Sequence, residues 1–261
     1  MELLTNISIA FLYSEPKFGS ETVSQSYMAE NLKVLDQKNE WYHVEQEDGY
    51  KAWIPASFVV NKPVDWDGYD LFNPAGQISK ILESPDRNSA AIRDVTLLTA
   101  LPLLKTTAGW VKVLLPDGNQ GWLCDRPRSV PTSFDVEALV ETAHQFLGIQ
   151  YTWGGKSPKG FDCSGFVQTC FKLNGMDLPR DSYLQAELGG QVSDEFGDWQ
   201  VGDLIYFSER PERITHVGIS LGEGKFIHAS GFVRINSLNP DHSDIFIDKY
   251  AMIYTRTMRL V

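Results

Sequence analysis

The chain has 261 residues, which is enough for one large domain or for two or three small ones. Its 34 acidic against 23 basic residues give a formal net charge of −11, which argues against non-specific binding to nucleic acids or to anionic surfaces. Hydrophobic residues make up 43% of the sequence, so a buried core is expected, but no apolar run is long enough to span a membrane.

The N-terminus lacks the pattern of a secretory signal. Glu2 follows Met1, and the apolar stretch over residues 7–13 is interrupted by Ser8. A secretory signal instead begins with basic residues and continues with about 7–15 apolar ones. The expected location is therefore the cytoplasm, and the alternative is an exported protein from which a signal peptide has been removed.

Two segments of the first half repeat one another. Residues 41–54 read WYHVEQEDGYKAWI, and residues 110–123 read WVKVLLPDGNQGWL, 69 residues later. Apolar residues alternate around Asp-Gly in both segments, which favours a β-hairpin because Asp and Gly tolerate the positive φ of a tight turn. We therefore expect two small all-β barrels, over residues 1–62 and 66–130, with the repeated tryptophans packed in their cores.

The second half has the pattern of a mixed α and β domain. Residues 134–147 have apolar side chains at helical spacing, after Thr132 and Ser133 as candidate N-caps and before Gly148 as a stop. A second helix is expected over residues 164–173. The expected strands lie over residues 203–207, 217–221, 225–229 and 250–259. Together these elements predict one α+β domain over residues 131–261.

One of the three cysteines has a sequence context that suggests chemistry. Cys163 stands in Gly-Phe-Asp-Cys-Ser-Gly-Phe-Val, directly before the second predicted helix. The N–H groups at a helix N-terminus stabilise a thiolate, lower the thiol pKa and can also stabilise an oxyanion. Cys163 is therefore a candidate nucleophile, with a buried structural thiol as the alternative. Cys124 and Cys170 are expected to be structural.

A cysteine nucleophile needs a base, and the base needs an orienting group. His216 and His228 stand in two β-rich runs that are joined by Gly222-Glu-Gly. A hairpin centred on Gly222 would place the two histidines directly opposite each other, within reach of a hydrogen bond. His216 would then take the thiol proton while His228 orients its imidazole. Two ordinary structural histidines are an alternative, and so is a zinc site, although a fourth ligand is lacking.

These residues resemble the NlpC family of papain-like cysteine peptidases, which cut bacterial cell-wall peptides. The tandem repeat is similar to bacterial SH3-like domains, so the resemblance covers nearly the whole chain. The implied fold class is two small all-β SH3-like barrels followed by a papain-like α+β catalytic domain. The motifs that carry the resemblance are Tyr151-Thr-Trp-Gly-Gly, Phe161-Asp-Cys-Ser-Gly-Phe, Leu178-Pro-Arg-Asp-Ser, Gly202-Asp-Leu-Ile-Tyr-Phe, His216-Val-Gly-Ile and Phe226-Ile-His.

The combined architecture resembles the γ-D-glutamyl-L-diamino acid endopeptidases, which act in cell-wall peptide recycling. The resemblance implies that Cys163, His216 and His228 form a catalytic triad. It also implies that the hydroxyl of Tyr151 assists the oxyanion or orients the substrate.

The resemblance further implies a site for a free N-terminal amine. Asp181 can supply the anion that a buried ammonium requires. Glu21 and Tyr50 match residues by which the first SH3-like domain of these enzymes closes the cleft and contacts the amine. Ala52 departs from the family pattern, since glycine is more usual before the tryptophan. The substrate-binding residues implied in this way are Asp181, Ser182, Trp153, Ser164, Glu21 and Tyr50.

The expected reaction is hydrolysis of the bond between γ-D-Glu and a diamino acid, either diaminopimelate or lysine, in peptides with a free N-terminal L-Ala. That small peptide is the only expected partner, with no cofactor, metal, nucleic acid or membrane, and the chain is expected to be a monomer. Two alternatives remain open: a lytic hydrolase of intact peptidoglycan, and a non-catalytic wall-binding protein built around the SH3-like pair.

Overall fold

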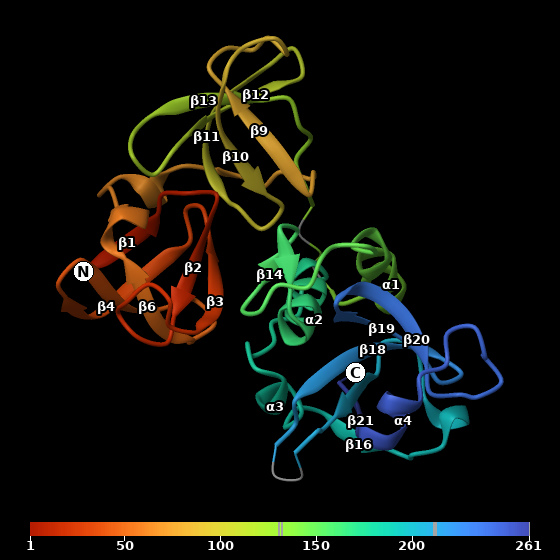
Figure 1. The fold of residues 1–261 in the computed structure, drawn as a ribbon. Helices are drawn as coiled ribbons and strands as arrows, with labels where there is room; N and C mark the ends of the chain where they lie inside the picture. Colours follow the sequence, from red (N-terminus) through yellow and green to blue (C-terminus); the bar gives the residue numbers. More distant parts are fainter. Residues whose placement is uncertain (130, 132, 211–212, 261) are drawn as a thin grey trace. The chain divides into compact units, whose positions relative to one another are not determined.

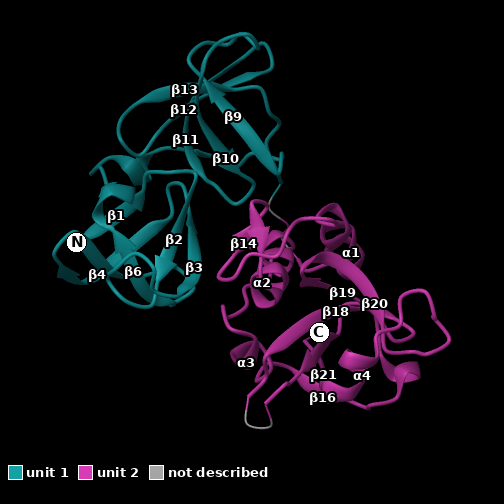
Figure 2. Ribbon diagram, viewed as in Figure 1, with its two compact units in different colours: residues 1–129 teal, residues 130–261 magenta. Residues whose placement is uncertain are grey.

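The computed structural model describes residues 1–261 except residues 130, 132, 211, 212 and 261. The chain forms two compact units, residues 1–129 and residues 130–261 (Figure 2). Unit 1 consists mainly of strands, whereas unit 2 combines helices with a sheet (Figure 1). Among the described residues, no helix is both long and apolar enough to cross a bilayer.

The first half of unit 1 is a small antiparallel β structure. Its elements are β1 (Glu2–Thr5), β2 (Ile9–Tyr13), β3 (Thr22–Tyr27), β4 (Asn31–Lys38), β5 (Trp41–Glu45), β6 (Lys51–Pro55), η1 (Ala56–Phe58) and β7 (Val59–Asn61). They form a sheet in the order β3-β2-β6-β5-β4-β1-β7. The predicted Asp-Gly hairpin is confirmed, because Glu45 pairs with Lys51 and Gly49 has φ of +80°. Leu12, Val44 and Ile54 are buried inside the sheet.

The second half of unit 1 repeats this plan. Its elements are η2 (Trp66–Gly68), β8 (Leu71–Phe72), β9 (Ile78–Leu82), β10 (Ala91–Thr96), β11 (Leu101–Thr107), β12 (Trp110–Leu114) and β13 (Gln120–Leu123). The sheet order is β10-β9-β13-β12-β11-β8. The second Asp-Gly hairpin is also confirmed, because Leu114 pairs with Gln120. Leu4 and Met28 of the first half pack into the core of the second, whereas Leu12, Val44 and Ile54 belong to a separate core of the first half.

The repeated tryptophans do not all occupy cores. Trp41 is buried, but Trp53, Trp110 and Trp122 are only half-buried. Trp53 stacks on His43 with ring centroids 4.9 Å apart. The expectation of core tryptophans was therefore wrong for three of the four, because aliphatic side chains such as Val44 and Val113 fill the interiors instead.

Unit 2 packs helices against an antiparallel sheet. The helices are α1 (Val136–Gln145), α2 (Cys163–Leu173), α3 (Ser182–Gln185), η3 (Phe196–Asp198) and α4 (Asp248–Ile253). The strands are β14 (Lys156–Ser157), β15 (Gly160–Phe161), β16 (Gly190–Val192), β17 (Leu204–Phe207), β18 (His216–Gly222), β19 (Lys225–Ser230), β20 (Phe232–Ser237) and β21 (Tyr254–Arg259). The main sheet has the order β16-β21-β17-β18-β19-β20, and α2 packs against β18 and β19 (Figure 1).

Two local predictions in unit 2 need correction. The N-cap of α1 is Asp135, whose carboxylate accepts a hydrogen bond from the Glu137 N–H at 2.9 Å, and not Ser133; Thr132 lies outside the described residues. The strand expected over residues 250–259 begins only at Tyr254, because Asp248–Ile253 form α4. A short apolar run does not distinguish helix from strand, and here the helix buries the ring of Tyr250 in the core.

Candidate active site

Cys163 is the first residue of α2. The preceding Asp162 is the N-cap, and its Oδ1 accepts a hydrogen bond from the Gly165 N–H at 2.7 Å. Such a cap stabilises a helix by roughly 1 kcal/mol. The position predicted for Cys163 from the sequence, at a helix N-terminus, is therefore confirmed.

A buried ion pair supports this helix start. The Arg180 guanidinium donates through Nη1 to Asp162 Oδ1 at 3.1 Å and to the Ser164 hydroxyl at 2.9 Å. The other carboxylate oxygen of Asp162 accepts from the Gly154 N–H at 3.0 Å. One carboxylate thus joins the loop before α2, the helix N-terminus and the segment that carries Arg180. Because these contacts are buried, they hold Cys163 in a defined place.

The thiol environment differs from the one expected. Burial, together with the Asp162 carboxylate, raises the pKa of Cys163 to about 12. Hydrogen bonds from the backbone N–H groups of Val217 and Ser164 lower it, as does Arg180, but these effects are smaller. The prediction that the helix N-terminus lowers the thiol pKa was therefore wrong in its net result, since the loss of hydration outweighs the helix N–H groups. A base must remove the thiol proton.

The two histidines lie on neighbouring strands, but not in the predicted register. Ser220 pairs with Phe226 and Ile219 with Ile227, and a bulge lies between Ser220 and Gly222. This pairing is shifted by two residues from the predicted one, so His216 and His228 are diagonal neighbours and not directly opposite. A shift of two keeps both side chains on the same face. His216 Nε2 and His228 Nδ1 are 2.7 Å apart, so the expected hydrogen bond is present.

Both imidazoles are surrounded by aromatic rings. The ring of Tyr250 stacks on His216 at 5.1 Å between centroids and meets His228 edge-on at 5.0 Å. Burial lowers the pKa of His228 to about 4 and that of His216 well below its usual value. Both rings are therefore neutral at neutral pH, and His216 can accept a proton.

The backbone N–H of Val217 donates to the Cys163 sulfur, which places the sulfur beside the strand residue that follows His216. The structure thus brings the helix start and the two histidines together. Among the described residues, no three or more His, Cys, Asp or Glu side chains gather as a set of metal ligands.

Tyr151 lies within electrostatic range of the thiol. Burial raises its pKa above the usual value, and the charge of a Cys163 thiolate would raise it further. Tyr151 therefore keeps its hydroxyl proton at neutral pH and can act as a hydrogen-bond donor. Its backbone N–H donates to the Gly231 carbonyl oxygen at 2.8 Å, which ties it to the segment between β19 and β20.

The predicted substrate residues of unit 2 occupy different environments. Asp181 precedes α3, and burial raises the pKa of its carboxyl group despite the opposing effects of Arg180, Tyr183 and Arg213. Ser182 is buried at the start of α3, whereas Trp153 is 60% exposed. The hydroxyl of Ser164 is buried and bonded to Asp162 and Arg180. Their substrate contacts stay predictions.

Glu21 and Tyr50 belong to unit 1, and their roles also stay predictions. The Glu21 carbonyl oxygen accepts from the Ser14 N–H at 2.9 Å, directly before β3. The Tyr50 N–H donates to Asp48 at 3.0 Å in the turn that precedes β6.

Two residues next to the histidines were missed by the sequence reasoning. Asn236 on β20 has its Oδ1 3.0 Å from His228 Nε2, and Tyr250 contacts both imidazoles. No spacing rule identifies either residue. Asn236 depends on the register of β19 with β20, and Tyr250 lies in a helix that was expected to be a strand.

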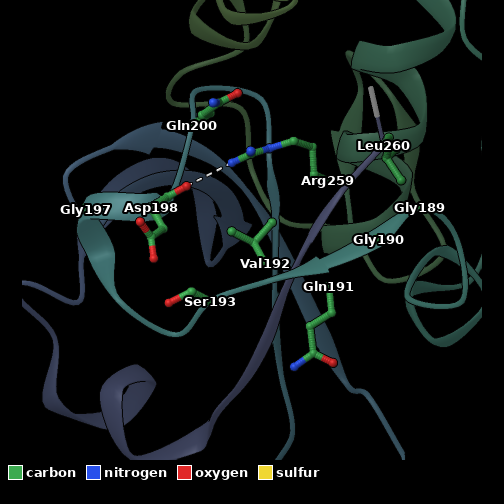
Figure 3. A pocket seen from close by; sticks show the side chains of 10 residues that line it. All are labelled: Gly189, Gly190, Gln191, Val192, Ser193, Gly197, Asp198, Gln200, Arg259 and Leu260. Atoms are coloured by element: carbon green, nitrogen blue, oxygen red, sulfur yellow. Dashed lines mark hydrogen bonds between the residues drawn. The ribbon is translucent and has the colours of Figure 1, made fainter.

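A separate hollow lies at the edge of the sheet, beside β16 and β21 (Figure 3). Its cationic residue, Arg259, already donates to the Asp203 carboxylate at 2.8 Å and to the Asp198 carbonyl oxygen at 2.9 Å. None of the predicted site residues lines it. The hollow is therefore distinct from the site around Cys163.

Comparison with known proteins assigns each part of the chain to a family. A "Bacterial dipeptidyl-peptidase Sh3 domain" matches residues 12–58, a "YKFC SH3b2 domain" matches residues 81–127, and the "NlpC/P60 family" matches residues 148–254.

Relatives match most of the chain. The γ-D-glutamyl-L-lysine dipeptidyl-peptidase of Bacillus subtilis (strain 168) is 38% identical, with 79% of this chain and 71% of that protein covered. The protein of the same name from Bacillus cereus (strain ATCC 10987 / NRS 248) is 30% identical, with 87% and 73% covered. The crystal structure of an NlpC/P60 family protein from Bacillus cereus ATCC 10987 has a TM-score of 0.84 at 25% identity, with 100% of this chain and 99% of that chain covered.

Two SH3b domains are therefore followed by a catalytic domain of a peptidase fold, which confirms the fold class expected from the sequence. The chain belongs to the NlpC/P60 family of cysteine peptidases.

Proposed function

We propose that the chain hydrolyses the bond between γ-D-Glu and a diamino acid in small cell-wall peptides that carry a free N-terminal L-Ala. The observation that carries the peptidase chemistry is the His216–His228 hydrogen bond of 2.7 Å beside the helix start that presents Cys163. The two relatives named γ-D-glutamyl-L-lysine dipeptidyl-peptidase support the choice of peptide bond. The biological setting that we propose is the recycling of wall peptides.

In the proposed reaction, Nδ1 of His216 removes the thiol proton of Cys163 as the sulfur attacks the γ-carbonyl carbon. The thiol must be deprotonated in this step because burial raises its pKa to about 12. The developing oxyanion is stabilised by N–H groups at the N-terminus of α2 and by the Tyr151 hydroxyl. His216 then returns the proton to the leaving amine, and water hydrolyses the thioester.

Asp181 is the proposed anchor for the free ammonium group of L-Ala. Burial raises the pKa of its carboxyl group, which means that the surrounding positive charges do not fully compensate the carboxylate. A substrate ammonium would supply this compensation through a charge-assisted hydrogen bond. Ser182, Trp153 and Ser164 are proposed to line the same site, and the proposed role of Glu21 and Tyr50 is to contact the amine from the first SH3b domain.

Product analysis on four tripeptides tests this proposal. L-Ala-γ-D-Glu-L-Lys and L-Ala-γ-D-Glu-diaminopimelate are each supplied with a free and with an N-acetylated amine. We expect release of L-Ala-D-Glu from the free peptides, and kcat/KM lower by at least about tenfold for the acetylated ones, because loss of a charge-assisted hydrogen bond costs about 1.5–3 kcal/mol.

Two variants make the test specific. Asp181→Asn should raise KM for the free peptides and should leave the slower reaction of the acetylated peptides unchanged. Cys163→Ala should abolish turnover and serves as the control for contaminating peptidases. Equal rates on free and acetylated peptides would instead support the lytic hydrolase of intact peptidoglycan, and binding without turnover would support the wall-binding protein.

A further inference from the structure

The side chain of Asn236 makes a hydrogen bond to the outer nitrogen of His228. Its Oδ1 lies 3.0 Å from His228 Nε2, on the side of the ring away from His216. Asn236 is on β20, where it pairs with Phe226, so it is the diagonal neighbour of His228 on the adjacent strand. Three side chains from three consecutive strands, β18, β19 and β20, are thus joined in one line of hydrogen bonds.

The orientation of the Asn236 amide follows from its second contact. Its Nδ2 lies 3.1 Å from the Ile245 carbonyl oxygen, which also accepts from the Ser237 N–H at 2.9 Å. A carbonyl oxygen can only accept, so the NH2 group must face Ile245 and the amide oxygen must face His228. The opposite orientation would bring two oxygen lone pairs together.

This orientation determines the tautomer of both histidines. Because Oδ1 can only accept, His228 Nε2 must be protonated. Burial lowers the pKa of His228 to about 4, so the neutral ring holds one proton and its Nδ1 has a lone pair. That lone pair accepts the hydrogen bond from His216, whose Nε2 must therefore be protonated. The remaining nitrogen of His216, Nδ1, is then unprotonated.

We infer that Asn236 is a positioning residue that fixes the protons along His228 and His216 so that Nδ1 of His216 is the free base. The catalytic consequence rests on the proposed function, in which that nitrogen takes the proton of Cys163. When it does, His216 becomes an imidazolium with both nitrogens protonated, and its Nε2–H still donates to His228. No proton moves to Asn236. Its neutral amide acts only by holding the imidazoles of His228 and His216 in one orientation and one tautomer.

The test begins with the unmodified protein and needs no substrate. Protein labelled with ¹⁵N-histidine is studied by NMR at neutral pH, because the ¹⁵N shift distinguishes a protonated from an unprotonated ring nitrogen. His216→Gln and His228→Gln assign the signals. We expect Nε2 protonated and Nδ1 unprotonated in both rings. Protonation of His228 at Nδ1 would overturn the inference.

Substitution of Asn236 links the tautomer to catalysis. Asn236→Leu removes the acceptor, so His228 should lose its single tautomer and kcat should fall about 10-fold to 100-fold, the range known when the partner of a metal-bound histidine is removed. KM should change little, because Asn236 acts on the reaction through His228. Asn236→Asp keeps an oxygen toward His228 and should keep the Nε2–H tautomer. Its second oxygen would face the Ile245 carbonyl oxygen, so kcat should lie between that of the unmodified protein and that of Asn236→Leu.

Asn239→Leu is the matched control. Asn239 is also half-buried, and its Oδ1 accepts from the Asp241 N–H at 3.0 Å and not from a histidine of the site. This variant should leave both tautomers and kcat unchanged. Asn236 has no positioning role if Asn236→Leu lowers kcat while both histidines keep their tautomers. The same conclusion holds if the variant changes neither kcat nor the tautomers. An inactive protein with the expected tautomers would instead contradict the proposed function alone.

Discussion

The Asp162 carboxylate and the Arg180 guanidinium form a buried ion pair directly beneath the helix start that presents Cys163. The Arg180 side chain is 1% exposed and that of Asp162 is 11% exposed. The pair therefore couples the stability of the domain to the position of the nucleophile.

Arg180→Gln should destabilise unit 2 strongly. Removing one partner leaves the Asp162 charge buried, which costs about 3–5 kcal/mol of unfolding free energy. Denaturant unfolding measures this loss. Lys249→Gln is the control, because both side chains of its ion pair with Glu209 are more than half exposed and the pair should contribute less than about 1 kcal/mol. Similar losses in the two variants would contradict the structural role given to the buried pair.

Gly218→Ala should disturb the histidine pair. A Cβ atom at this position would lie 2.8 Å from the Phe226 ring and 3.2 Å from the Cβ of His228. The strands β18 and β19 would have to shift, with an expected destabilisation of about 1–3 kcal/mol and a lower kcat. Gly190→Ala, where the added atom meets nothing within 4 Å, is the control for thermal unfolding and for turnover. Unchanged kcat in Gly218→Ala would show that the register tolerates the shift.

The buried histidines should make the fold sensitive to acid. The pKa of His228 is lowered from its usual 6.5 to about 4, so between these values the unfolded chain binds a proton that the folded chain does not. The unfolding free energy is therefore unaffected by the protonation of His228 above about pH 6.5. It falls as the pH decreases below this value, and the loss reaches roughly 3 kcal/mol near pH 4. His228→Gln should flatten the dependence of the unfolding free energy on pH over this window. A pH dependence in His228→Gln that equals that of the unmodified protein would refute the explanation.

Alkylation of Cys163 should show no thiolate in the resting protein at neutral pH. Because burial raises its pKa to about 12, its rate with iodoacetamide should be low near pH 7 and should rise about tenfold per pH unit toward pH 10. The experiment uses Cys124→Ser, since Cys124 is exposed and would react first. A rate that is already constant below about pH 8 would indicate a thiolate–imidazolium pair instead.

Much of the local structure could be predicted from the sequence. The Asp-Gly hairpins are indicated by adjacent residues, and so is the helix start at Cys163, which Asp162 caps. The bulge between Ser220 and Gly222 could not be predicted, because a register depends on how whole strands pack. The N-cap at Asp135 and the helix at Asp248–Ile253 were missed for related reasons, since competing caps and short apolar runs are decided by the surrounding core.

The sequence by itself determined the kind of chemistry: a cysteine at a helix N-terminus and two histidines in neighbouring strands, within an acidic chain of repeated β units. Only the tertiary structure decided the state of those groups. Burial keeps the thiol and both imidazoles neutral, and the strand register brings Asn236 to His228. A sequence motif consists of residues that are close together in the chain. Desolvation and the direction of hydrogen bonds depend on residues that are distant in the chain. The protonation states of a site therefore follow from its packing.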